Sequence, residues 1–399
     1  MKGIAILCLV LAGCLAAGAA GAATAIVIDT ANAYSSNREV TDTLPLGQKV
    51  EPVRADKDWV LVKYSKEREE TIRQGWVERS KIEEIPEGFD SRVSEHCILH
   101  AQEPNYAERF DLKVTEEFYN AVARSLVNGK EEPPFNPNVK LRIYLLNRET
   151  YLDAAKRRGE PTDGVGFRPA LGSVYLEYSL RATTPPMSGL IVHEFAMLVL
   201  RDYANQPPGR ATAGAPLPLW IIEAFAMYHE YLAGFNTDDL THVADKPKLS
   251  TITNRTSVPT KEEDRIEYLA TAGTLGHMLL NYGSSERFSG LVRVLQATAG
   301  RGESPSVTML KYYGNMTKIK FQTEWARYVS ELKEKYGIKK REEEIKDQEE
   351  DEGDGLFSPS SGNWIDNYLK GFLPGKSNRA VRRSFISRLR SALAEKLKP

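Results

Sequence analysis

The stretch GLIVHEFAMLVL, from Gly189 to Leu200, decides how the rest of this sequence is interpreted. Apolar residues lie on both sides of a histidine and a glutamate, which predicts a buried helix with a polar pair in its middle. Burying such a pair costs free energy unless other groups match it. The stretch is therefore either a helix that carries a metal site, complete or with one ligand lost, or an ordinary buried helix.

A helix can hold a metal ion with two ligands spaced four residues apart, because this spacing puts both side chains on one face, one turn apart. A glutamate directly after the first ligand can take a proton from metal-bound water. His193 and Glu194 meet these requirements, but Met197 stands where the second ligand is expected. A thioether is a soft, neutral donor that is poor for Zn²⁺. Met197 also suits an apolar core.

A third ligand must come from another element of the fold. The segment PLPLWIIEAFAMYHEY, residues 216–231, predicts a second helix, in which Glu223 is the first polar group after an apolar run. Its two candidate partners are a metal ion and the imidazole of His193. His229 lies about 240° further around this helix and is expected to point elsewhere. His277, in a later apolar helix, is interpreted as a core histidine, with replacement of the missing ligand as the alternative.

Together these segments resemble the gluzincin clan of metallopeptidases, in the peptidase MA-like branch. The HExxH helix of that family matches HEFAM at residues 193–197. Its P-x-W-x-x-E-G-x-A-x-Y segment matches residues 218–228, with Ala224 in place of the usual glycine. The resemblance covers about residues 92–337. The later helices of the family match at Asn281, Tyr282, Gly283 and Trp325.

The resemblance implies a zincin-type (metallopeptidase) domain over residues 90–338, with His193 and Glu223 as metal ligands and Glu194 as the catalytic base. Because Met197 replaces the second zinc histidine, we expect a pseudopeptidase without tightly bound zinc, whose cleft serves binding or scaffolding. One alternative is an active zinc metallopeptidase whose ligand set is completed by water or another residue. The other is a structural envelope protein that binds the cell wall.

Residues 24–85 predict a small β-domain, because short runs rich in β-branched residues alternate with turn-like polar clusters. Gly47 and Gly75 are expected at tight turns, and Trp59 and Trp76 in the core of a small barrel. The order AIVIDTANAYSS, LPLGQKVEPV, DWVLVKYS and QGWVERSKI resembles the bacterial SH3 (SH3b) domain. That resemblance implies an SH3-like β-barrel that either binds cell-wall peptide or glycan, such as peptidoglycan, or is only a spacer.

Residues 1–23 are typical of a secretory signal, because Lys2 precedes an apolar run rich in alanine and glycine. Cleavage after Ala22 competes with lipidation of Cys14 at a lipobox-like Leu-Ala-Gly-Cys, and an uncleaved membrane anchor is a third alternative. Either cleavage predicts export to the bacterial periplasm or cell envelope, the second as an anchored lipoprotein. With Cys8 and Cys14 in the signal, Cys97 is alone in the body and is expected in the core.

Strand-like segments alternate with helical patterns before residue 189, whereas only helical patterns follow it, which predicts an α+β fold. The first of these strands, VSEHCILH, places His96 and His100 on one face. Polar histidines on an edge strand are the preferred interpretation, and a metal pair is the alternative.

The chain has 399 residues, of which 41% are hydrophobic, and a net charge of -1. This composition suits a globular protein of more than one domain and does not indicate nucleic acid as a partner. Residues 339–362 predict an acidic linker and residues 363–399 a basic amphipathic tail. We expect the tail to dock on its own protein, with a membrane surface or an acidic partner, such as another envelope protein, as the alternative. The apolar positions of the tail are Val381, Phe385, Leu389 and Leu393.

Overall fold

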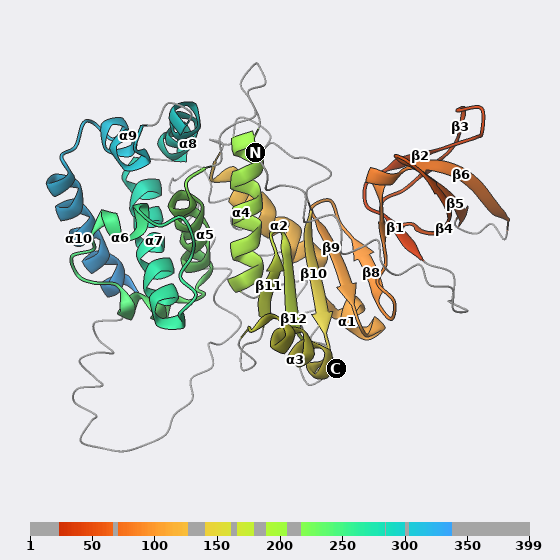
Figure 1. Ribbon diagram of the computed structural model, residues 1–399, viewed down its shortest axis with the longest axis horizontal. Helices are drawn as coiled ribbons and strands as arrows, with labels where there is room; N and C mark the ends of the chain where they lie inside the picture. The colour runs from red at the N-terminus through yellow and green to blue at the C-terminus, as the bar shows by residue number, and fades with distance from the viewer. Residues whose placement is uncertain are drawn as a thin grey trace, which may run out of the picture. The chain divides into compact units, whose positions relative to one another are not determined.

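The computed structural model of this chain describes residues 24–66, 71–126, 140–160, 166–178, 189–205, 217–283, 285–299 and 303–336. They form a mixed α+β fold, as predicted, and divide into two compact units with the boundary between Glu95 and His96 (Figure 1). The expected signal with Cys8 and Cys14, the acidic linker and the basic tail lie outside the described residues. None of the described helices is long and apolar enough to cross a bilayer.

The first unit is built from short antiparallel strands. They pair in the order β3-β2-β6-β5-β4-β1-β7, so β3 and β7 stand at the two ends of the order. A 3₁₀ turn, Arg79–Lys81, precedes β7, and β8, Asp90–Val93, is the last strand before the unit boundary. The seven strands are β1 Ala25–Val27, β2 Ala31–Tyr34, β3 Val40–Leu44, β4 Lys49–Asp56, β5 Trp59–Ser65, β6 Ile72–Glu78 and β7 Ile82–Glu84.

The core of this unit contains small and β-branched side chains, and the two tryptophans predicted there are outside it. Val60, Val62 and Tyr64 point into the core from β5. Because side chains alternate along a strand, Trp59 faces the other side, and Trp76 does the same on β6. Both are half-buried, so the prediction that they fill the core was wrong.

The two glycines that were predicted at tight turns of the first unit have different roles. Gly47 has a φ of +82° in the turn before β4, as predicted. Gly75 lies inside β6, so the prediction of a turn there was wrong. A Cβ at Gly75 would lie 2.9 Å from the Cβ of Ala33, which shows that the backbones of β6 and β2 approach closely at this point.

The other sheet has five strands, is mixed and has the order β11-β12-β10-β9-β8; its strands from β9 onward belong to the second unit. The central strands β9, β10 and β12 are parallel, and β11 pairs antiparallel with β12 at the edge. Parallel neighbours need crossover connections, and α2 and α3 lie in these connections. The elements are α1 Pro104–Arg109, α2 Leu112–Arg124, α3 Arg148–Arg158, β9 Cys97–Ala101, β10 Leu141–Leu146, β11 Gly166–Ala170 and β12 Ser173–Glu177.

The position of β9 corrects the expectation for His96 and His100. This strand lies between β10 and β8, so it is not an edge strand. His100 lies in β9 and His96 immediately before it, and both are buried, with His100 stacked on Tyr144 at 4.8 Å between ring centroids. Cys97 is buried in the same strand, as expected for a core residue.

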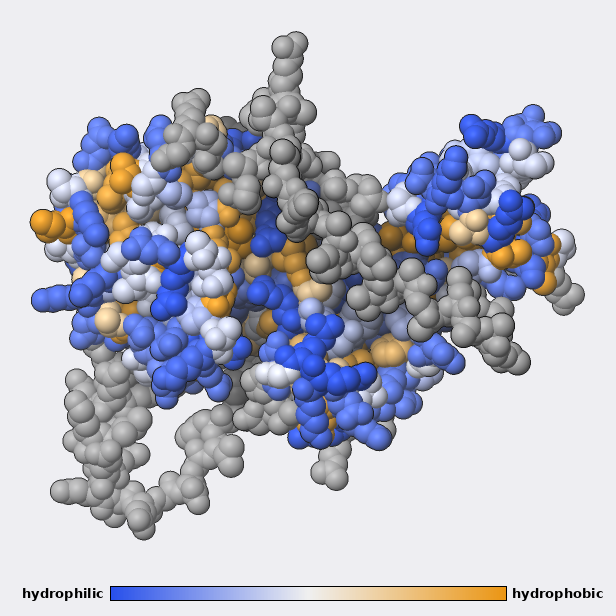
Figure 2. Space-filling model, in the orientation of Figure 1, coloured by the Kyte–Doolittle hydropathy of each residue, from blue (hydrophilic) through white to orange (hydrophobic). Residues whose placement is uncertain are grey.

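After the sheet, every described regular element is a helix, as the sequence predicted. In Figure 1, α4 runs along the sheet, and α5 and α7 follow on the side of α4 that faces away from the strands. Figure 2 shows mostly hydrophilic side chains over the outer helices in this view, with hydrophobic surface between them. The helices are α4 Gly189–Asn205, α5 Leu219–Ala233, α6 Leu249–Thr253, α7 Glu262–Gly283, α8 Ser285–Ala299, α9 Pro305–Tyr312 and α10 Lys318–Lys335, with a 3₁₀ segment at Thr237–His242.

The contact between α5 and α7 is unusually close because glycines line it. A Cβ at Gly276 would lie 1.9 Å from the carbonyl oxygen of Ala224, so no side chain fits at this position. Gly273 is similarly close to Met227 and Tyr231. These contacts fix the helix that carries Glu223 between its two neighbours, α4 and α7.

Candidate functional site

Two buried helices bring the predicted site residues together. On α4, His193 is 7% exposed, Glu194 is fully buried and Met197 is 2% exposed. On α5, which begins after Pro218, Glu223 is 1% exposed. Both helices are apolar on nearly all sides, which explains why they lie inside the helical half of the unit.

The imidazole of His193 lies between two carboxylates of α5. Its Nε2 atom is 3.1 Å from Oε2 of Glu223, and its Nδ1 atom is 2.5 Å from Oε1 of Glu230. Glu230 lies seven positions after Glu223, so the two share one face of the helix about two turns apart. The side-chain amide of Asn236 donates a hydrogen bond to Oε2 of Glu230 and holds this carboxylate in place.

The electrostatic environment of His193 favours its charged form. Burial alone would lower its pKa, but hydrogen bonds and charge interactions with Glu223 and Glu230 outweigh burial and raise the pKa to about 10. Burial would likewise raise the pKa of Glu223, but His193 lowers it, helped by the charges of Arg168 and Arg201. His193 and Glu223 are therefore a buried ion pair at neutral pH.

Glu194 has a different partner, which the sequence analysis did not identify. Nη1 of Arg168 donates a hydrogen bond to Oε1 of Glu194 at 2.9 Å, and the backbone N–H of Gly172 donates to Oε2 at 3.2 Å. The same Nη1 atom lies 3.2 Å from the sulfur of Met197. A guanidinium group therefore contacts both the expected catalytic base and the residue in the second ligand position.

The charge of Glu194 also acts on Arg168 itself. Burial would lower the pKa of Arg168, but the charge and hydrogen bond of Glu194 outweigh burial and raise it. The Arg168 side chain is 36% exposed and reaches the site from β11, an edge strand that the sequence analysis did not predict. Pro169 in this strand weakens the strand pattern, although proline is tolerated at a sheet edge.

Several buried polar atoms near Glu223 have no hydrogen-bond partner among the described residues. They include Oε1 of Glu223 itself, an acceptor, and Nε of Arg201, a donor. The hydroxyl of Tyr268 is a third such atom. Burial raises the pKa of Tyr268, and the charge of Glu223 raises it further. Buried polar groups normally have partners, so these three atoms mark a polar environment around Glu223 that side chains of the described residues do not fully satisfy.

The remaining histidines of the helical half are placed elsewhere. His229 is fully buried and its Nε2 atom lies 3.2 Å from Oγ of Ser125, consistent with the opposite face of α5. Nδ1 of His277 lies within hydrogen-bond distance of the hydroxyl of Tyr328 and the amide nitrogen of Asn281, at 2.8 and 2.9 Å. His277 is therefore a core histidine with partners of its own.

Sequence reasoning missed Glu230 and Arg168 for different reasons. Glu230 was visible in principle, because it follows Glu223 by seven residues and so shares its helix face. No spacing in the sequence links Arg168 to the site, because its side chain reaches α4 only when β11 pairs at the edge of the folded sheet. The side chain of Tyr282, which the resemblance singled out, lies outside the described side chains.

The donor set does not fit a three-ligand zinc site. His193 and Glu223 meet as two ligands would, and Glu230 on Nδ1 resembles the carboxylate that orients metal-binding histidines. The third donor, however, is the thioether of Met197, which Zn²⁺ binds poorly. In addition, the cationic group of Arg168 contacts that sulfur, and it would repel a metal ion at the same place.

No model of a known protein family matches this chain, and no curated protein matches it.

Proposed function

We propose that the second unit is a peptidase MA-like domain that has lost its metal and acts as a pseudopeptidase, which binds or scaffolds other molecules at the bacterial cell envelope. The observation that carries this proposal is the contact of Arg168 with both Glu194 and Met197. A general base must accept a proton from water within hydrogen-bond reach. Glu194 is instead fully buried, and its two oxygens already accept hydrogen bonds from Arg168 and from the Gly172 backbone.

The charges of the site support the same proposal. Glu194 and Glu223 are buried carboxylates that a zinc centre would balance with a divalent ion. Here cationic side chains of the protein itself, Arg168 and His193, contact them directly. Binding a metal ion to these carboxylates gains less free energy, because Arg168 and His193 would have to move or lose a proton first.

Metal content and peptide hydrolysis of the full chain test the proposal. We expect no peptide cleavage above background, and no zinc whose binding depends on Glu223. Glu223→Gln and Glu194→Gln are the matched variants, since each keeps the side-chain size and removes the charge. Zinc that is lost in Glu223→Gln, together with cleavage that is lost in Glu194→Gln, would overturn the proposal in favour of an active zinc peptidase with a non-standard ligand set.

A second candidate function rests on the first unit, which we propose to be an SH3b-like domain that binds the cell wall. Three aromatic side chains, Tyr34, Trp59 and Trp76, share the half-buried face opposite the core. The rings of Tyr34 and Trp59 meet edge to face, with centroids 5.3 Å apart. Half-exposed aromatic rings of this kind offer an apolar surface with polar tips, which suits a ligand.

Sedimentation of the full chain with peptidoglycan tests this second candidate. We expect the chain to be retained and the double variant Trp59→Ala/Trp76→Ala to lose most of its binding. Ile72→Ala is the control, because Ile72 is 69% exposed on the same sheet. If the chain is not retained at all, the first unit is a spacer.

A further inference from the structure

A second group of metal-ligating side chains lies just before β9 and on α2, outside the His193 site. Glu95, His96 and Glu116 each offer one ligand atom, and these three atoms all lie within 4.8 Å of one another. Glu95 and His96 are consecutive, so the peptide bond fixes them next to each other, and Glu116 comes from α2. The fold thus supplies a third ligand, which the sequence around His96 lacks.

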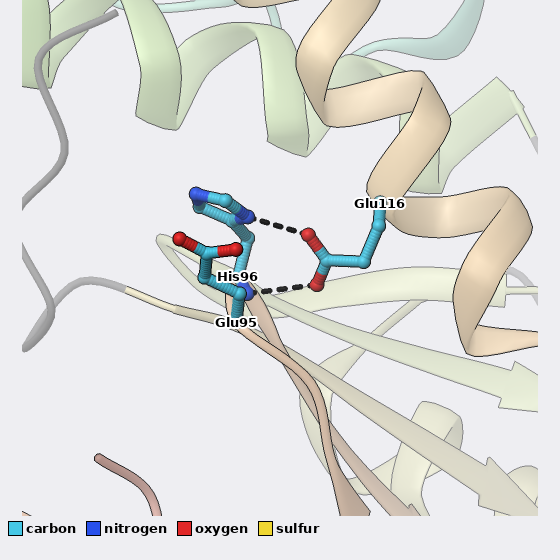
Figure 3. Close-up of side chains that lie close together, drawn as sticks. All are labelled: Glu95, His96 and Glu116. Carbon is cyan, nitrogen blue, oxygen red and sulfur yellow. Dashed lines mark hydrogen bonds and ion pairs between the residues drawn. The ribbon is translucent and has the colours of Figure 1, made fainter. Parts of the chain in front are cut away.

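The imidazole of His96 is held in a fixed orientation. Glu116 bridges it, with Oε2 at 2.5 Å from Nδ1 and Oε1 accepting the backbone N–H of His96 at 2.8 Å (Figure 3). On its flat face the ring stacks on Tyr119, with 3.5 Å between centroids and 16° between planes. Pre-oriented ligands favour binding, because little freedom remains to be lost when an ion arrives.

The geometry points to a binding site for a divalent transition-metal ion, with Zn²⁺ as the model ion, formed by Glu95, His96 and Glu116. One imidazole nitrogen with two carboxylate oxygens is a donor set that suits Zn²⁺ and other divalent transition-metal ions, whereas Mg²⁺ and Ca²⁺ prefer ligands that are all oxygen. Tetrahedral ligands about 2.0–2.2 Å from zinc lie roughly 3.3–3.6 Å from one another. The contact of 2.5 Å between Nδ1 of His96 and Oε2 of Glu116 therefore has to open by about 1 Å.

Access for an ion differs from that at the His193 site. The side chain of Glu95 is exposed and that of Glu116 is partly exposed, so a hydrated ion can reach them from solvent. His96 also connects to the central helix α4 through Tyr119. The ring of Tyr119 stacks on His96 and meets Phe195 of α4 edge to face, with 6.1 Å between the centroids of the Tyr119 and Phe195 rings. An ion that ties the start of β9 to α2 is therefore expected to stabilise the fold around α4.

Titration of the chelator-treated full chain with Zn²⁺ in a calorimeter tests this site. We expect one ion per chain, with affinity reduced roughly tenfold or more in Glu116→Gln and in His96→Gln. Glu117→Gln is the matched control, since Glu117 is the exposed neighbour on the same helix and is not in the cluster. Should His96→Gln fail to fold, Glu95→Gln at the exposed ligand serves in its place. Mg²⁺ in place of Zn²⁺ should bind far more weakly.

The same titration separates this inference from the proposed function. Binding that survives Glu223→Gln and is lost in Glu116→Gln supports the Glu95-His96-Glu116 site and leaves the pseudopeptidase proposal intact. The reverse pattern would overturn both. Absence of zinc binding in the unaltered chain would overturn this site alone, as would equal affinities for Glu116→Gln and Glu117→Gln.

Discussion

At the scale of single residues, Glu194 depends on Arg168, because a fully buried carboxylate needs a cation or several hydrogen bonds. We expect Arg168→Ala to lower the free energy of unfolding by about 1–3 kcal/mol, less than for a fully buried pair because Arg168 is partly exposed. In the Glu194→Gln background, Arg168→Ala should lower the free energy of unfolding much less. Urea denaturation of the two single variants and the double variant measures this coupling, and additive effects would contradict it.

Met197 is the second residue that determines whether the site can bind zinc, and its effect depends on whether Arg168 is present. Met197→His supplies the missing ligand, but the guanidinium of Arg168 remains beside it. We therefore expect tight, Glu223-dependent zinc binding only in the double variant Met197→His/Arg168→Ala. Zinc titrations in the Glu116→Gln background, which removes the proposed second site, measure the difference. Equal binding by Met197→His alone would show that Arg168 is no obstacle.

At the scale of elements, the crossing of α5 and α7 requires a glycine. A Cβ at Gly276 would overlap the backbone of Ala224, which cannot move without shifting the helix that carries Glu223. We expect Gly276→Ala to destabilise the protein by about 3 kcal/mol or more. Gly290→Ala on α8 is the control, because there the nearest atom is the terminal hydroxyl of Tyr312. In thermal unfolding, Gly276→Ala should have a clearly lower melting temperature than Gly290→Ala. Equal melting temperatures would contradict the close crossing of α5 and α7.

The buried histidines of α5 and α7 predict how stability depends on pH. Burial lowers the pKa of His229 to about 3, and burial together with the charge of Lys335 lowers that of His277 to about 3. In the unfolded chain a histidine has a pKa of about 6.5. Between these values the unfolded chain binds more protons, so the free energy of unfolding falls as pH decreases from about 6.5 toward 3.

The size of this effect can be measured with one variant. Each histidine contributes up to about 1.4 kcal/mol per pH unit within that window. We expect His229→Gln to reduce the slope by about one proton, measured by urea denaturation at several pH values. His242→Gln is the control, since His242 is exposed in the 3₁₀ segment after α5. An unchanged slope in His229→Gln would mean that this histidine is charged in the folded protein.

The helices of the site followed from sequence, but its charge pattern did not. The apolar runs of α4 and α5 predicted both helices, and the isolated polarity of Glu223 predicted a partner such as His193. Arg168 could not be predicted, because its strand is five residues long and contains Pro169. The tryptophans of the first unit were misplaced because size suggested a core position, whereas strand alternation assigned Trp59 and Trp76 to the opposite face.

At the scale of the whole molecule, the division at residue 95 predicts how the protein unfolds. Each unit has its own hydrophobic cluster, around Val62 in the first and around α4 and α5 in the second. Units with separate cores can unfold separately. We therefore expect Val62→Ala to lower the stability of the first unit and leave the transition of the second unchanged. Calorimetry of the full chain measures this, and a shift of both transitions together would contradict it.

The N-terminal segment is predicted to be a secretory signal, and its two candidate cleavage sites would give different mature proteins. Cleavage after Ala22 leaves a chain that begins at Ala23, two residues before β1. Cleavage before Cys14 leaves a lipid-bearing cysteine and anchors both units to a membrane. We expect the first outcome, because the A-x-A site ends the apolar run, whereas the lipobox-like motif comes early within it. Mass spectrometry of the protein from a bacterial host measures the mature N-terminus, with Cys14→Ser as the control. A lipid-sized mass increment on the unaltered chain that Cys14→Ser abolishes would show that the protein is a lipoprotein instead.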